Sequence, residues 1–119
     1  MSFEFETLNV YHESKRFCSE IYLRTRLFPD SELYGLTSQL RRAAVSVVAN
    51  LAEGCGRRTR VEQRRFYNIG HASLYECVAL LGIAVDLLLL TEDDYKPIRN
   101  KAESISAMLN GLIKYTKKI

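Results

Sequence analysis

The sequence has 119 residues, of which 47% are hydrophobic and 26% charged, and its net charge is +3. This composition is that of one globular domain, residues 1–119, and excludes a disordered or collagen-like chain. Only six glycines and two prolines occur, too few turn residues for an all-β fold of this length.

A first helix is predicted over residues 7–27. Apolar side chains recur in it at helical spacing, and those expected to face inward are Val10, Phe17, Ile21 and Tyr22. Pro29 ends this helix, because the residue before a proline is pushed out of helical geometry. The second helix is then capped by Asp30 and Ser31, or by Thr37 after an extra turn.

The third helix is predicted from a capping-box pattern at residues 59–62, Thr-Arg-Val-Glu, to about residue 90. The glycines of Gly54-Cys55-Gly56 end the helix before it, because glycine can adopt the left-handed conformation that closes many helices. Small and apolar residues keep a 4-3-4-3 spacing along the third helix: Phe66, Gly70, Ser73, Cys77, Leu80, Ala84 and Leu87. Others widen this stripe past one face: Ile69, Leu74, Leu81, Ile83 and Leu88. This excess of apolar residues over one helix face indicates that the third helix forms a subunit interface or, alternatively, that it is the most buried helix of the fold.

The fourth helix is predicted to begin after Thr91, which can cap it, with three acidic residues in its first turn. Pro97 either kinks this turn or marks a later start of the helix. A heptad-like seam follows, made of Ile98, Ala102, Ile105, Leu109, Leu112, Thr116 and Ile119. Four long helices with short connections predict an all-α fold, an antiparallel up-down four-helix bundle.

Three features bear on where the protein resides. The most apolar run, residues 78–90, is shorter than the roughly 20 residues that cross a bilayer, and Asp86 interrupts it, so no membrane partner is expected. The start of the chain lacks the basic region of a signal peptide. Cys18, Cys55 and Cys77 form neither a CxxC motif nor an even set, which favours the reducing cytoplasm.

A polar stripe runs along the predicted second helix. Its members follow one another at spacings of four, four, three and four residues, so they share one face: Arg42, Ser46, Asn50, Glu53 and Arg57. On a helix otherwise rich in alanine and valine, these groups need hydrogen-bond partners. We interpret them as structural contacts between helices or subunits, because no nucleophile and base accompany them.

A basic patch is predicted where the second helix meets the third. Seven arginines stand against two glutamates between Arg41 and Arg65, and such a local excess attracts nucleic acid or acidic partners. The free N–H groups and positive dipole end of the third helix reinforce this attraction. The candidate nucleic-acid-binding residues are Arg41, Arg57, Arg58, Arg60, Arg64 and Arg65. Solvated surface charges and ion pairs between subunits are the alternatives.

No metal site and no cofactor are predicted. A bundle can hold two irons with a Glu on each of two helices and a Glu-x-x-His motif on the other two. One acid is available on each predicted helix, namely Glu20, Glu53, Glu76 and Glu103. The Glu-x-x-His motif is missing, however, and His12 and His71 are the only histidines. The cysteines also lack the close spacing of a zinc site.

Two sequence blocks carry a family resemblance. The first reads S-x-x-x-N-x-A-E-G-x-G-R, and Arg42 precedes its matching residues Ser46, Asn50, Glu53, Gly54 and Arg57. The second is close to G-S-L-x-E and is matched by Ser73, Leu74 and Glu76. These blocks, in a match over nearly the whole chain, resemble the four-helix-bundle proteins encoded by intervening sequences within bacterial large-subunit ribosomal RNA genes.

The resemblance implies a homopentamer in which bundles pack around a central axis, with no assigned activity. A relative, the accessory variability determinant of diversity-generating retroelements, binds nucleic acid and a reverse transcriptase through a basic surface. We therefore predict a non-enzymatic, self-associating bundle that binds RNA or DNA non-specifically through residues 57–65, without a small-molecule substrate. The alternative is a protein–protein adaptor or structural assembly module with no nucleic-acid role.

Overall fold

The computed structural model describes residues 3–118, and these fold into four α-helices. The helices are α1 (Asn9–Thr25), α2 (Leu36–Cys55), α3 (Arg60–Asp86) and α4 (Glu92–Thr116). Two short 3₁₀ turns, η1 (Glu4–Thr7) and η2 (Asp30–Glu32), precede α1 and α2. The described residues contain no β-strand, so the predicted all-α four-helix fold is confirmed.

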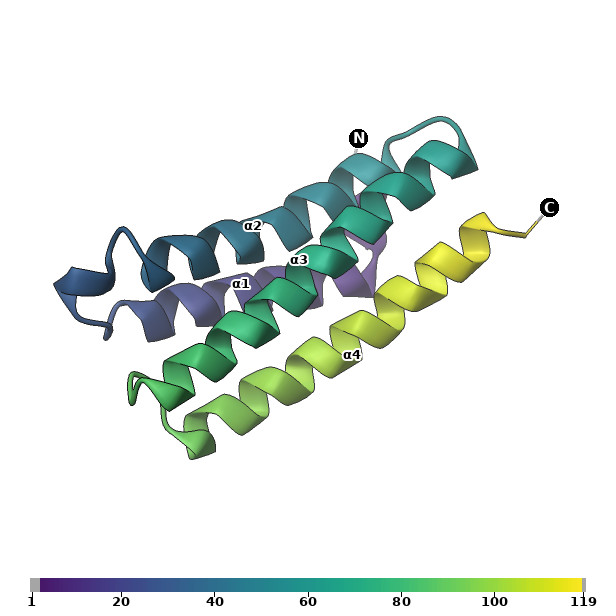
Figure 1. Cartoon of the computed structure of the whole chain (residues 1–119). Coiled ribbons are helices and arrows are strands. Elements are labelled where there is room, and N and C mark those ends of the chain that lie inside the picture. Colours follow the sequence, from purple (N-terminus) through teal and green to yellow (C-terminus); the bar gives the residue numbers. More distant parts are fainter. Residues whose placement is uncertain (1–2, 119) are drawn as a thin grey trace.

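The helices pack side by side into an elongated bundle of 47 × 24 × 22 Å. α1 contacts α2 and α4, and α3 contacts the same two helices. Figure 1 shows each helix running back along the one before it, with the turn between α2 and α3 at the same end of the bundle as the end of α4. The turns between α1 and α2 and between α3 and α4 lie at the opposite end. Because of this arrangement, charged residues of the α2–α3 turn lie at the same end of the bundle as those at the end of α4.

The first helix is shorter than predicted by two residues at each end. Val10, Phe17 and Ile21 are buried, as expected, but Tyr22 is 37% exposed. The prediction for Tyr22 is wrong because its ring forms a surface platform, with the guanidinium carbon of Arg41 4.7 Å from the ring centre.

Both predicted caps at the start of α2 are wrong, as is the predicted left-handed glycine at its end. The chain makes an extra 3₁₀ turn, so Gly35 stands at the cap position and the Glu32 carboxylate accepts the Leu36 N–H at 3.3 Å. Thr37 is buried inside the helix. At the other end, Gly56 has an ordinary right-handed φ of −85°.

The start of α3 is confirmed and its end is not. Thr59 caps the helix, since its Oγ1 accepts the Glu62 N–H at 3.2 Å. The helix stops at Asp86, four residues early, because Leu88 takes the left-handed conformation with a φ of 62°. The Leu89 N–H then donates to the Ala84 carbonyl at 2.9 Å, which closes the turn.

The prediction for α4 is confirmed at its cap and along its seam. Thr91 Oγ1 accepts the Asp94 N–H at 3.1 Å, and the helix runs without a break through Pro97, so the later start is wrong. The seam residues Ile98, Ala102, Ile105, Leu109 and Thr116 are buried, and Leu112 is half-buried. Ile119 lies outside the described residues.

α3 carries more apolar surface than the core of one chain covers. Leu74 and Leu81 are buried, whereas Ile69 and Ile83 are exposed by 41% and 46%, and Leu87, just after the helix, by 54%. It is also the one described helix that is long and apolar enough to span a membrane by length and composition, a test that core helices also pass. Since several apolar side chains face outward, α3 is not simply the most buried helix.

The cap of α3 gives a first testable expectation. Replacing Thr59 by alanine leaves the Glu62 N–H without its side-chain acceptor, and we expect the free energy of unfolding to fall by about 0.5–2 kcal/mol. Urea denaturation followed by circular dichroism measures the change. Thr59→Ser keeps the hydroxyl and is the matched control; equal losses in both variants would contradict the assigned cap.

Candidate functional site

A hydrogen-bonded polar group joins α2 to α3. The hydroxyls of Ser46 and Ser73 lie 2.7 Å apart, and Asn50 Nδ2 donates to the Ser46 hydroxyl and carbonyl, both at 2.9 Å. Ser73 is 9% exposed, and the other two are half-buried. The contact satisfies polar groups that would otherwise weaken a helix interface. The middle of the polar stripe therefore ties two helices of the same chain together.

Glycines allow α2 and α3 to approach closely beside this contact. A Cβ at Gly54 would lie 2.7 Å from Cε1 of Tyr67, and a Cβ at Gly70 would lie 3.4 Å from the Val47 carbonyl oxygen. The Tyr67 ring fills this space and is 4% exposed. Burial, with Cys55 beside the hydroxyl, raises the pKa of Tyr67 to about 12. The glycine of the predicted motif thus serves packing.

The outer members of the polar stripe are not buried. The Glu53 side chain is 57% exposed and meets Arg57, which lies two residues past the end of α2, at 3.7 Å, so this pair is local and does not tie α2 to another helix. Arg42 and Glu76 are also exposed. A surface pair such as Glu53–Arg57 contributes at most about 0.5 kcal/mol.

Arg41 does not belong to the basic patch. It lies in the second turn of α2, whereas Arg57 follows the last residue of that helix, Cys55. Its Nε donates to Thr25 Oγ1 at 2.9 Å, and its guanidinium lies over the Tyr22 ring. Among residues 3–118, neither Arg41 nor Arg42 forms an ion pair with Glu76. Arg41 instead fastens α2 to the end of α1.

The other five arginines gather at the turn between α2 and α3. Arg57 and Arg65 both lie near the Phe66 ring, with guanidinium carbons 4.4 and 5.6 Å from the ring centre. Arg65 also meets Glu62 at 3.7 Å. Arg58 and Arg64 form no ion pair with a carboxylate of residues 3–118. Arg60 likewise lacks a carboxylate partner, so three of the five charges are not neutralised by residues 3–118.

The end of α4 adds basic residues that the sequence analysis did not assign to this patch. Arg60 donates to the Lys118 carbonyl and lies 4.9 Å from the centre of the Tyr115 ring. This contact brings the exposed Lys114, Lys117 and Lys118 to the same end of the bundle. We define the basic end as Arg57, Arg58, Arg60, Arg64, Arg65, Lys114, Lys117 and Lys118. Only the chain topology reveals it, because the lysines are some 50 residues from the arginines.

A groove opens beside the basic end, between η1 and the α2–α3 turn. Its volume is about 570 Å³, and its lining includes Phe3, Glu4, Phe5, Arg57 and Arg58. Gln63 Nε2 donates to the Arg57 carbonyl at 3.1 Å and holds the turn in shape. We call this the junction groove. Its lining combines two phenylalanines, two arginines and one glutamate.

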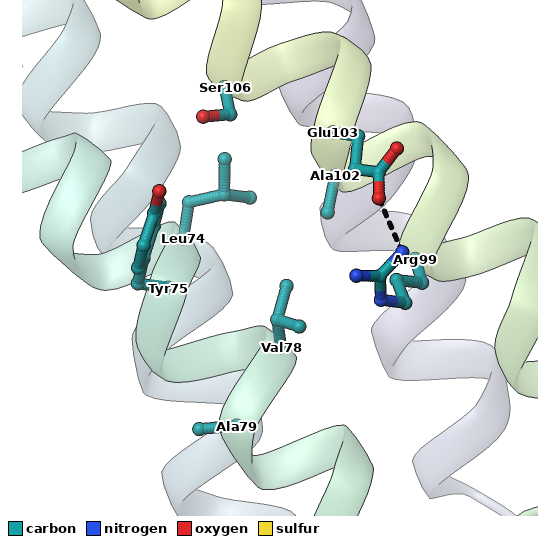
Figure 2. A pocket seen from close by; sticks show the side chains of 8 residues that line it. All are labelled: Leu74, Tyr75, Val78, Ala79, Arg99, Ala102, Glu103 and Ser106. Atoms are coloured by element: carbon teal, nitrogen blue, oxygen red, sulfur yellow. Dashed lines mark hydrogen bonds and ion pairs between the residues drawn. The ribbon is translucent and has the colours of Figure 1, made fainter.

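A second cleft, of about 490 Å³, lies between α3 and α4. Figure 2 shows Leu74 and Val78 pointing into it and the Arg99–Glu103 ion pair on its far side. Next to it, His71 Nε2 lies 2.9 Å from Ser106 Oγ, a contact between helices that the sequence did not predict. Both residues lie inside helices whose N–H groups are already used, so no backbone oxyanion site accompanies the pair.

Metal ligation has no geometric support in residues 3–118. No three His, Cys, Asp or Glu side chains in this part of the chain lie close enough together to hold a metal ion. All three cysteines are free thiols, and burial raises the pKa of the Cys77 thiol to about 12, with the charge of Glu76 adding to the effect. A protonated thiol is a poor metal ligand and a poor nucleophile.

Residues 6–111 match the model of the 23S rRNA-intervening sequence protein family. A crystal structure of a protein of unknown function from the S23 ribosomal protein family, from Bacteroides thetaiotaomicron, is similar with a TM-score of 0.80 and 24% sequence identity. The match covers 88% of this chain and 98% of that one. No curated protein matches. With a family match over most of its length, the chain belongs to the 23S rRNA-intervening sequence protein family.

Proposed function

We propose that this chain is a non-enzymatic, self-associating bundle of the bacterial cytoplasm that binds the phosphate backbone of nucleic acid through its basic end. The observation that carries the proposal is the gathering of five arginines and three lysines from three segments at one end of the bundle. Clustered cations release the counterions of nucleic acid, which is the main source of sequence-independent binding.

The charges of the basic end remain available to a ligand. Arg57 and Arg65 make ion pairs of 3.7 Å, but their side chains are 46% and 65% exposed. Such surface pairs are weak, so a phosphate can replace either carboxylate at small cost. Arg58 lies just before the first turn of α3, whose free N–H groups and dipole also favour anions.

Self-association is the second part of the proposal, with the pentamer of the family resemblance as the expected form. It is supported by the apolar side chains that α3 leaves exposed, among them Ile69 and Ile83. In a pentamer, five basic ends act together, and the avidity of the assembly exceeds the affinity of one chain.

Replacing Arg58 and Arg64 together by glutamine tests the proposal. We expect the affinity for a fluorescein-labelled 20-nucleotide RNA at about 50 mM salt to fall about tenfold or more. The slope of log K against log salt should become shallower by about 1.4–1.8, since each lost phosphate contact removes roughly 0.7–0.9. Fluorescence anisotropy between 20 and 200 mM salt measures both quantities.

The matched control removes two charges at the opposite end, with Arg26→Gln and Lys96→Gln, both at exposed positions. Wild-type affinity in the control supports a local basic end. No retention of RNA or DNA by the wild-type protein at 20 mM salt would overturn the proposal. In that case the alternative, a protein–protein adaptor or structural module, is favoured, because α3 exposes apolar surface and Arg57 pairs with Glu53.

A further inference from the structure

We infer that the junction groove receives an unpaired base, so that the preferred ligand of the basic end is single-stranded nucleic acid. This inference rests on the proposed function, because the basic end has to hold the phosphate backbone next to the groove. The charges alone attract the phosphates of single and double strands alike. The groove determines which form of nucleic acid is preferred and where its bases lie.

One wall of the groove is a stacked pair of aromatic rings. Phe3 is 71% exposed, and its ring lies parallel to that of Phe5, with centroids 5.8 Å apart and planes 16° apart. Phe5 in turn contacts Tyr11 edge to face at 4.8 Å. An exposed ring backed by a second ring is a platform on which a base can stack.

This platform is fixed to the bundle. The Phe3 N–H donates to the Glu6 carboxylate at 2.8 Å, and His12 Nε2 pairs with the Glu6 carbonyl oxygen at the same distance. Through His12, η1 is therefore anchored to the first turn of α1. A platform held in place costs less conformational entropy when a base binds than a free terminal segment would.

The lining of the groove also includes Arg57 and Arg58. Arg57 is oriented by the ring of Phe66 at 4.4 Å, and Gln63 fixes its backbone. An arginine plane can stack on a base or meet the phosphate that follows it. With a volume of about 570 Å³, the groove has the size of a small-ligand site.

Glu4 decides which part of a nucleotide lies inside the groove. Its carboxylate belongs to the lining and disfavours a phosphate there, while it can accept a hydrogen bond from the amino group of a base. The phosphates then lie outside, on Arg58 and Arg64. In a duplex, bases are paired and stacked on each other, so their faces are closed to Phe3.

The test compares a labelled 20-nucleotide RNA of mixed sequence with the same RNA annealed to its complement. Phe3→Leu removes the ring but keeps an apolar side chain at an exposed site. We expect it to weaken binding of the single strand about fivefold or more, as the loss of one stacked base does, and to change duplex binding by less than about twofold. Tyr34→Leu is the control, since Tyr34 is 94% exposed and distant from the groove.

The results separate the inference from the proposed function. Equal binding of Phe3→Leu and the wild type to the single strand overturns the inference; if the Arg58→Gln/Arg64→Gln variant still loses affinity, the proposed function stands alone. Preference of the wild type for duplex overturns the inference in the same way. Absence of binding to either form at 20 mM salt overturns both.

Discussion

Replacing Gly54 by alanine is expected to lower the free energy of unfolding by about 1–3 kcal/mol, because it overpacks the crossing of α2 and α3. The new Cβ would lie 2.7 Å from Cε1 of Tyr67 and 3.1 Å from Cβ of Phe66. Neither neighbour can move freely, since Tyr67 is buried and the Phe66 Cβ is fixed to the backbone of α3. Chemical denaturation measures the loss.

Gly111→Ala is the matched control for this prediction. Gly111 lies in α4 with nothing within 4 Å of an added Cβ, so the variant should gain up to about 1 kcal/mol from the better helix propensity of alanine. A stabilised Gly54→Ala protein would show that the two helices do not approach as closely as the structure indicates.

Alkaline pH is expected to unfold the protein through two buried groups. Burial raises the pKa of Cys77 from 9.0 to about 12, and burial next to Cys55 raises the pKa of Tyr67 from 10.0 to about 12. Both groups are neutral in the folded chain and ionise more readily in the unfolded one. Their contribution to the free energy of unfolding is therefore complete below pH 9. It is lost as the pH rises from 9 to 12, and in total it amounts to about several kcal/mol.

Denaturation curves at a series of pH values between 8 and 11 measure this loss. Tyr67→Phe and Cys77→Ala each remove one of the ionising groups, so the stability of each variant should depend less steeply on pH. Tyr34→Phe, at a fully exposed position, should leave the pH dependence unchanged. A wild-type stability that is constant up to pH 11 would contradict the burial of Cys77 and Tyr67.

The helices, two of their caps and much of the core were predictable because they depend on local patterns. Thr59 and Thr91 precede helices with acidic first turns, and both accept the expected N–H. Periodicity also identified Leu109 as a core residue. The end of α2 was also predicted correctly, since the helix ends at Cys55 with Gly56 as its cap. The conformation of Gly56 was not predictable, because the sequence does not distinguish its right-handed φ from a left-handed one.

The basic site was predicted only in part, because sequence proximity is not spatial proximity along a helix. Arg41 is sixteen residues from Arg57, which along α2 amounts to about 24 Å, and it is held by Thr25 at the far end. Conversely, Lys117 is distant in sequence and joins the patch because α4 ends beside the start of α3. The role of Phe3 in a groove likewise depends on how η1 folds back.

Native mass spectrometry of the purified protein mixed with a single-stranded 20-nucleotide RNA at low salt tests the central claim most directly. It weighs the assembly and any bound RNA together. We predict a complex of five chains of 13.7 kDa each that retains the RNA and releases it as salt is raised. A single 13.7 kDa chain beside free RNA at low salt would contradict both the self-association and the nucleic-acid binding proposed for the basic end.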